Sequence, residues 1–139
     1  HTPAHHATLA AHLPFPLATT QPEYSPAVLD PLRDGTFDLC LRDGVVPLAW
    51  SPLGGGRLIS GEGVRPELIS LLDDLAEREG VDRAAVCIAF VLSHPCAPVA
   101  ILGTQTPARL TAATAALGVT LDRADVYAIV QASEGVPLP

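Results

Sequence analysis

Positive charge is scarce in this chain. Its 139 residues include eight Lys and Arg against 15 Asp and Glu, and the formal net charge is −7. A surface that binds nucleic acid or anionic lipid needs clustered cations, so this balance argues against both partners. Long apolar runs are also missing, because none reaches the roughly 20 residues that span a bilayer. The opening HTPAHHATL lacks a basic region followed by an apolar one, so we expect no signal peptide.

Cysteine is rare as well. The three cysteines, Cys40, Cys87 and Cys96, lie far apart and show no CxxC or Cys/His spacing, so no zinc site is predicted. Their odd number and apolar neighbours indicate reduced, partly buried thiols whose role is packing, and thus a cytoplasmic location.

Histidine gathers near the start of the chain, at His1, His5, His6 and His12. On a helix, His5 and His6 point about 100° apart and His12 lies two turns beyond His5. A polar helix face therefore explains these residues better than a metal site, and we predict no metal ligands. The first residue is not methionine, so we expect either that something has been removed or that the sequence is a piece of a longer chain.

Apolar periodicity divides the chain into alternating strands and helices. Short strand patterns lie at about 17–21, 45–50 and 98–102. Helical patterns cover 3–12, 36–43, 66–79, 82–95, 106–117 and 122–133. We expect amino-terminal caps at Thr2, Asp82, Thr106 and Asp122, with Asp125 completing a capping box, and left-handed ends at Gly44 and Gly80. The helix after Asp82 is apolar nearly all round, which predicts deep burial.

This alternation predicts an α/β fold of parallel βα units in a single domain over residues 1–139. Three strands cannot close a barrel, and they leave a thin open sheet with two unpaired edges. We therefore expect exposed apolar surface on the isolated chain. Such a chain would be partly molten, would associate with itself, or would pair with a missing half of the fold.

Small residues follow two of the predicted strands, in WSPLGGGR and LGTQTPARL. Ligands of α/β proteins sit beyond the carboxyl ends of parallel strands, where small residues let them approach main-chain N–H groups. In the second motif Thr104, Thr106 and Arg109 surround a predicted helix start, which favours an anion. An ordinary capped helix with a solvated arginine explains the same residues equally well. Neither motif is a P-loop or a GxGxxG fingerprint.

Taken together, TQPEYSP, VVPLAWSPLGGGRL and LGTQTPARLTAATAAL resemble the carboxyl-terminal half of the aldo-keto reductases, in particular a branch of predicted bacterial oxidoreductases. The resemblance implies a partial (β/α)8 TIM barrel carrying strands six to eight, their helices and the carboxyl-terminal helix. It further implies binding of NADP(H) and hydride transfer that interconverts aldehydes or ketones and alcohols. A small carbonyl compound would be the substrate.

The same resemblance implies roles for individual residues. Gln21 matches the glutamine that binds the nicotinamide carboxamide, and Trp50 matches the aromatic residue that stacks on the ring. The segment that embraces the pyrophosphate corresponds to Ser51, Pro52, Leu53, Gly54, Gly56 and Arg57. The pocket for the adenosine ribose and its 2′-phosphate corresponds to Gly103, Thr104, Gln105, Thr106 and Arg109.

Two departures from the family pattern bear on function. Gln105 replaces the usual lysine, so Arg109 is left as the cation for the 2′-phosphate. The catalytic Asp, Tyr, Lys and His of the family lie on strands that this chain lacks, and neither Tyr24 nor Tyr127 matches the catalytic tyrosine. We thus predict the cofactor-binding half of a reductase with no catalytic residue of its own. A non-catalytic half-barrel that binds a nucleotide or a partner, or a truncated reading frame without function, remain alternatives.

Overall fold

Three parallel strands form the sheet, in the order β1-β2-β3, in a computed structural model that describes residues 2–137. The strands are β1 (Thr19–Thr20), β2 (Val46–Ala49) and β3 (Val99–Ala100). Parallel pairing aligns β1 with β2 and β2 with β3, which confirms the predicted α/β character. The strands are shorter than predicted. Pro22 and Pro98 flank β1 and β3, and a residue without an N–H cannot donate to a ladder. His1 lies outside the described residues.

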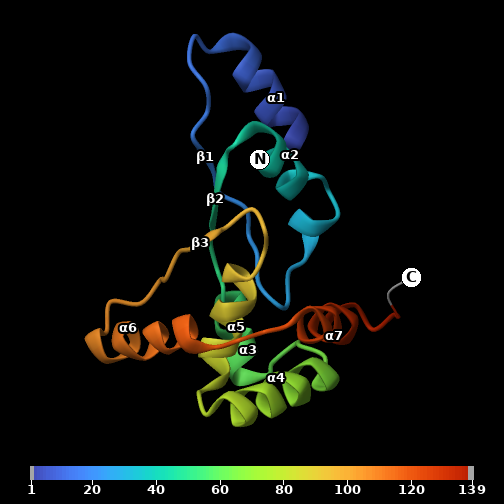
Figure 1. The fold of residues 1–139 in the computed structure, drawn as a ribbon, viewed down its shortest axis with the longest axis vertical. Helices are drawn as coiled ribbons and strands as arrows, with labels where there is room; N and C mark the ends of the chain where they lie inside the picture. The colour runs from blue at the N-terminus through green and yellow to red at the C-terminus, as the bar shows by residue number, and fades with distance from the viewer. Residues whose placement is uncertain (1, 138–139) are drawn as a thin grey trace.

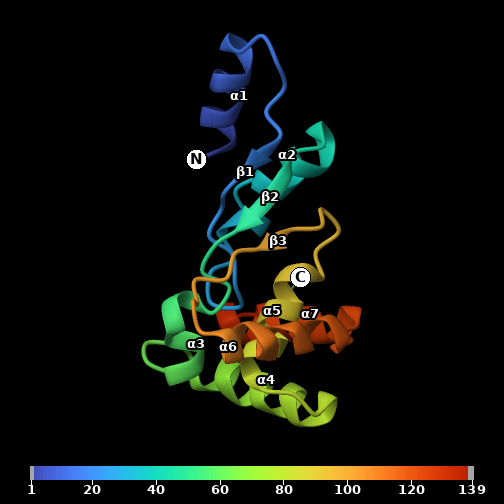
Figure 2. The ribbon, with the colours of Figure 1, turned by 90° about the vertical axis from the view of Figure 1, so that its left-hand side faces the viewer.

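Seven α-helices and three short 3-10 helices accompany the sheet within the described part of the chain. The α-helices are α1 (Pro3–His12), α2 (Thr36–Asp43), α3 (Arg57–Ser60), α4 (Pro66–Glu79), α5 (Arg83–Leu92), α6 (Pro107–Ala113) and α7 (Arg123–Glu134). The 3-10 helices are η1 (Asp30–Leu32), η2 (Gly54–Gly56) and η3 (Thr114–Gly118). Helices α3 to α7 gather at one end of the molecule and α1 lies at the opposite end (Figure 2).

Two helical segments differ from the sequence prediction. The stretch after Trp50 was expected to be a loop, but it contains η2 and α3. The helix that begins at Pro107 was expected to reach residue 117, but its α-helical part ends at Ala113 and continues as η3. The Thr114 hydroxyl donates to the Thr111 carbonyl at 2.6 Å, a side-chain bond that competes with regular helical bonding.

Most of the predicted caps are present. The Thr2 hydroxyl accepts the His5 N–H at 3.3 Å, and Asp82 accepts the Ala85 N–H at 2.8 Å. Gly44 ends α2 in the left-handed region, with a φ of 68°. Thr106 occupies the predicted N-cap position of α6, but its side chain makes no capping hydrogen bond, so that part of the prediction is wrong.

Helix α5 is the centre of the core. All seven residues at positions 85–91 are buried, as the apolar sequence predicted. One side of the helix joins the main cluster, in which Phe90 packs against Tyr24 with ring centroids 5.4 Å apart. The other side joins a second cluster that includes Ile88 and Ala116. The sheet therefore has helices on one face, with α5 between the sheet and α4 (Figure 1).

The opposite face of the sheet carries exposed apolar side chains. Val46, Trp50 and Val99 expose 41%, 43% and 50% of their surface. The register pairs Leu48 with Val99, and alternation along β2 places Val46, Leu48 and Trp50 on one face. The expectation of an open sheet with uncovered apolar surface is met.

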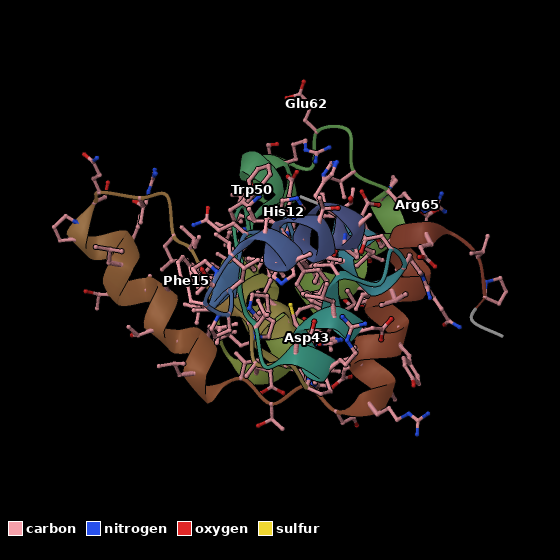
Figure 3. All side chains as sticks on the ribbon, turned by 90° about the horizontal axis from the view of Figure 1, so that it is seen from above. His12, Phe15, Asp43, Trp50, Glu62 and Arg65 are labelled. Carbon is pink, nitrogen blue, oxygen red and sulfur yellow. The ribbon has the colours of Figure 1, made fainter. Side chains whose placement is uncertain are left out.

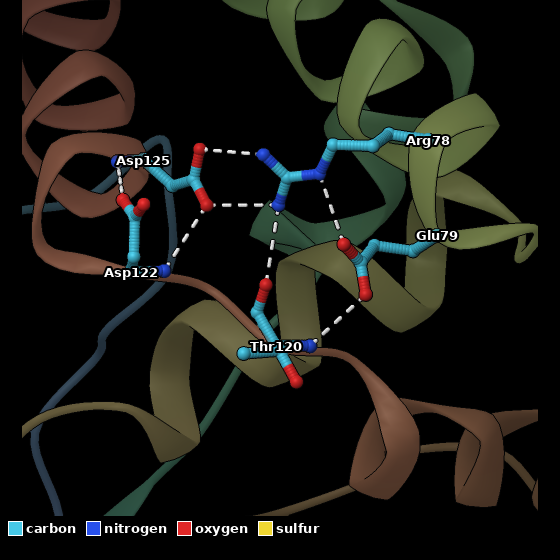
Figure 4. Close-up of polar contacts among 5 residues, drawn as sticks. All are labelled: Arg78, Glu79, Thr120, Asp122 and Asp125. Carbon is cyan, nitrogen blue, oxygen red and sulfur yellow. Dashed lines mark hydrogen bonds and ion pairs between the residues drawn. The ribbon is translucent and has the colours of Figure 1, made fainter.

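A charged network fastens the carboxyl-terminal helix. Arg78 on α4 binds both carboxylate oxygens of Asp125 at 2.8 Å and the Thr120 carbonyl at 3.1 Å (Figure 4). Glu79 accepts the Thr120 N–H at 3.1 Å. Asp125 also forms the predicted capping box with Asp122. The Arg78 guanidinium lowers the pKa of the Asp125 carboxyl through these hydrogen bonds.

We predict that Phe90→Ala lowers the free energy of unfolding by about 3–5 kcal/mol, because a buried ring leaves both lost burial and a cavity. Phe15 is the matched control, since 60% of its surface is exposed. For Phe15→Ala we expect a change within about 0.5 kcal/mol. Urea denaturation followed by circular dichroism measures both variants, made in the full-length protein. Equal effects would contradict the place of Phe90 at the centre of the core.

Candidate functional site

The carboxyl ends of the strands bring Gln21 and Trp50 to one face of the sheet. Gln21 directly follows β1 and Trp50 directly follows β2. Trp50 pairs with Glu23 in a parallel bridge, and its N–H donates to the Pro22 carbonyl at 3.1 Å. Gln21 precedes Glu23 by two residues, so it lies on the same face about 7 Å along the neighbouring strand. Both side chains are exposed, and Figure 3 labels Trp50 at the surface of the molecule.

The segment after Trp50 turns sharply. Ser51 has a positive φ of 56°, which is uncommon for a residue other than glycine. Its carbonyl accepts the Gly54 N–H at 2.8 Å and closes the turn. Gly56 has a φ of 91°, and a Cβ at this position would meet no atom within 4 Å. Glycine is therefore required at Gly56 by conformation rather than by crowding, and the loop surface around it is open.

Other residues of this segment face inward. Gly54 is buried, and a Cβ there would touch Ala27 and Leu58 at 3.5 Å. Leu53 packs against both principal core clusters, and Pro52 is buried. Within the segment Ser51, Pro52, Leu53, Gly54, Gly56 and Arg57, the side chains of Pro52 and Leu53 thus support the loop, and any ligand contacts there would come from the main chain.

Two arginines bind carbonyl groups of the glycine loop and of helix α3, which follows it. The Arg57 Nε donates to the Gly54 carbonyl at 3.0 Å. Arg83, at the first turn of α5, donates to the Leu58 and Ile59 carbonyls at 2.9 and 3.2 Å. Asp73 holds the same guanidinium and raises its pKa. Sequence reasoning missed Arg83, although an arginine in the first turn of a helix, where it opposes the dipole, is a signal that it has another partner.

The segment after β3 is more exposed than the glycine loop. Gly103 and Gln105 are exposed, and the Thr106 N–H donates to the Thr104 hydroxyl at 3.2 Å. The Arg109 side chain is exposed too, and within residues 2–137 no ion pair, side-chain hydrogen bond or ring contact is assigned to it. Arg109 is thus available to an anion from solution.

The two tyrosines lie in different surroundings. Tyr24 exposes 1% of its surface, and its ring packs edge-on against Phe37 at 4.7 Å. Burial raises the pKa of Tyr24. Tyr127 lies on α7 under the Arg123 guanidinium.

The described residues contain no group of three His, Cys, Asp or Glu side chains that could hold a metal ion. The histidines of α1 instead take part in local bonds: the Thr2 N–H donates to His5 Nδ1 at 3.4 Å, and His12 Nδ1 lies 3.1 Å from the Thr8 carbonyl. No helix among residues 2–137 combines the length and the apolar character needed to cross a bilayer.

Comparison with known proteins assigns the chain to a family. The Aldo/keto reductase family model matches residues 1–134, so the chain belongs to this family and the resemblance seen in the sequence is confirmed. The chain is 41% identical over 124 residues to 6-dehydroglucose reductase of Novosphingobium aromaticivorans, covering 88% of the chain and 41% of that protein. It is 38% identical over 142 residues to oxidoreductase YdhF of Escherichia coli, covering 99% of the chain and 46% of that protein. The chain spans less than half the length of these relatives.

Solved structures agree on the fold. The thermostable aldo-keto reductase Tm1743, solved with the inhibitor epalrestat, superposes with a TM-score of 0.80 at 21% identity, over 91% of this chain and 43% of that one. Aldose reductase from Giardia lamblia gives 0.76 at 22% identity, over 100% of this chain and 44% of that one. The α/β fold with its small parallel sheet therefore matches part of the aldo-keto reductase fold.

We predict that Arg83→Ala speeds amide hydrogen exchange across residues 54–61 by at least about tenfold, since a hydrogen bond to a charged group is worth about 1.5–3 kcal/mol. Arg42→Ala is the control, because Arg42 pairs with its neighbour Asp43 and 70% of its side chain is exposed. Exchange followed by mass spectrometry measures both. Unchanged exchange in Arg83→Ala would show that this arginine does not hold the loop.

Proposed function

We propose that residues 1–139 form the cofactor-binding part of an NADP(H)-dependent aldo-keto reductase that interconverts aldehydes or ketones and alcohols. The observation that carries the proposal is where the candidate cofactor residues lie in the fold. Gln21, Trp50 with its glycine loop, and the GTQT segment all follow the carboxyl ends of three adjacent parallel strands. Ligands of parallel α/β folds bind at this edge.

Gln21 and Trp50 would bind the nicotinamide end of the cofactor. An exposed indole on an uncovered sheet face offers a flat apolar surface on which an aromatic ring can stack. The Gln21 amide can donate to and accept from a carboxamide. When bound, NADPH supplies the hydride. The chain's own part is to fix which face of the ring is presented to the substrate.

Main-chain N–H groups and Arg109 would bind the phosphate groups of the cofactor. The open loop at Gly56 lets a pyrophosphate approach backbone N–H groups closely. The segment Gly103, Thr104, Gln105 and Thr106 offers two hydroxyls and an amide beside the free guanidinium of Arg109. A phosphate can engage that guanidinium through two parallel hydrogen bonds, which a ribose hydroxyl cannot do.

The proton donor of the reaction lies outside these residues in this proposal. Tyr24 is buried in the core, and Tyr127 lies on α7 and exposes 45% of its surface. A chain that spans 41% of one relative and 46% of another leaves more than half of each unaccounted for. We place the catalytic tetrad in that remainder, which would close the barrel against the exposed face of Val46, Trp50 and Val99. 6-Dehydroglucose is the first substrate to assay, because one relative is named as its reductase.

We expect Arg109→Ala, made in the full-length protein, to weaken NADPH binding by about 1.5–3 kcal/mol, or roughly 10- to 150-fold. NADH lacks the 2′-phosphate, so its affinity should change little. Titration of both cofactors into wild type and variant measures the difference. Arg123→Ala is the control, since that side chain stacks on Tyr127. Equal losses for NADH and NADPH would overturn the assignment of Arg109 to the phosphate.

We also expect the isolated chain to be inactive toward a generic aldehyde such as a nitrobenzaldehyde. A positioned acid contributes about 10²–10⁴-fold, and our proposal places that acid outside these residues. NADPH oxidation that depends on both chain and aldehyde would contradict this.

In sedimentation the isolated chain should be expanded or self-associated, and addition of the missing half of the fold should restore a compact species. A compact monomer with a sharp thermal transition would argue against the pairing.

A further inference from the structure

Two cysteines approach the opposite end of the sheet, where the strands begin. Cys40 on α2 lies six residues before Val46, the first residue of β2, and Cys96 lies three residues before Val99, the first residue of β3. Because β2 and β3 are adjacent and parallel, their amino ends share one edge. Cys96 packs against the small cluster of Leu39, Cys40 and Val45. This packing brings the two cysteines into one neighbourhood, and a disulfide needs their Cα atoms to come within about 4.4–6.8 Å.

His94 lies against the Cys96 thiol. Its Nδ1 is 3.0 Å from Cys96 Sγ and accepts the Cys96 N–H at 3.2 Å. In the tautomer that accepts the Cys96 N–H, Nδ1 carries no proton, and the same lone pair also faces the Cys96 thiol. The turn that holds this arrangement is closed by the Ala97 N–H, which donates to the His94 carbonyl at 2.9 Å. Ala97 has a φ of 49°, so the turn holds a non-glycine residue in the left-handed region.

The surroundings keep all of these groups neutral. Burial raises the pKa of Cys96 to about 11 and also raises the pKa of Cys40. Burial lowers the pKa of His94, against a smaller opposing effect of Asp38 on α2. Tyr24 faces Cys96, and Asp43 faces Cys40. Burial therefore favours the protonated form of both thiols, and oxidation needs a base.

We propose that Cys40 and Cys96 form a reversible disulfide under peroxide, with His94 as the base. Cys96 Sγ passes its proton to His94 Nδ1 and attacks the peroxide, so that an S–O bond forms and the O–O bond breaks. The released hydroxide takes up a proton and leaves as water. The Cys40 thiol then displaces the oxygen, which leaves as a second water, and an S–S bond remains. Two thiols are oxidised by two electrons and one hydrogen peroxide is reduced.

This site is separate from the proposed cofactor site, which lies at the carboxyl ends of the same strands. The inference therefore stands or fails independently of the proposed function. Its closest competitor within the chain is Cys87, which is fully buried in α5. The tryptic peptide 84–109 carries both Cys87 and Cys96, whereas 34–42 carries Cys40 alone. Substitution is needed to tell the two apart.

The test treats the full-length protein with hydrogen peroxide, digests it without reductant and measures peptides by mass spectrometry. We expect a cross-link of 34–42 to 84–109 that dithiothreitol removes. The cross-link should persist in Cys87→Ser and vanish in Cys96→Ser and in Cys40→Ser. Oxidation of Cys96 to sulfinic acid without a cross-link, or a cross-link that survives in Cys96→Ser, would overturn the proposal.

His94→Ala isolates the role of the base. Proton transfer by a positioned group is worth about 10²–10⁴-fold in rate, so we expect cross-linking at neutral pH to slow by at least about tenfold. His12→Ala is the matched control, because His12 lies on α1 and bonds to the Thr8 carbonyl. A retained rate in His94→Ala, with circular dichroism unchanged, would remove His94 from the proposal.

Discussion

Helix α5 has to be covered on every side, and most of the fold follows from that requirement. Its residues 85–91 are all buried and carry no charge. The sheet, α4, α3 and η3 supply the cover, and Phe90 and Ile88 anchor the two clusters on its opposite sides. Each fully buried aliphatic or aromatic side chain contributes about 1.5–3 kcal/mol relative to exposure. No polar element of the chain could take this position.

The same requirement explains why one face of the sheet stays bare. Helices α3, α4 and α6 pack on α5, and Val46, Trp50 and Val99 remain exposed on the other face of the sheet. The chain spans less than half the length of its relatives. The bare face of the sheet is the same face that carries the candidate cofactor residue Trp50. Trp50 is exposed for the same reason that the sheet is open, which is that its face has no covering layer within these residues.

The sequence predicted the helix ends that depend on neighbouring residues, and it did not predict the contacts between residues far apart in the chain. The caps at Thr2, Asp82 and Asp122 and the left-handed end at Gly44 depend on a few neighbouring residues, so the pattern predicts them. The early end of α6 coincides with a local bond from the Thr114 hydroxyl to the Thr111 carbonyl, which the apolar pattern does not register. The short helix α3 buries Leu58 in the main cluster, a tertiary contact that no local pattern encodes. Arg83 contacts carbonyl groups about 25 residues away in sequence, which no local pattern encodes. The cofactor residues came from family resemblance, because glycine runs and a threonine-rich helix start have ordinary structural explanations.

Strand β2 has the cysteine pair near its amino end and Trp50 at its carboxyl end, and the length of the strand separates the two. Val45, beside Cys40, precedes the strand, and Trp50 follows it. The four residues between them span roughly 13 Å at about 3.3 Å per residue. Across that distance the strand is held on both sides by its neighbours and on one face by the core. A bond formed at the amino end can therefore reach the carboxyl end only by moving the strand as a unit. Since close-packed interiors resist such small shifts, the two ends are expected to act independently.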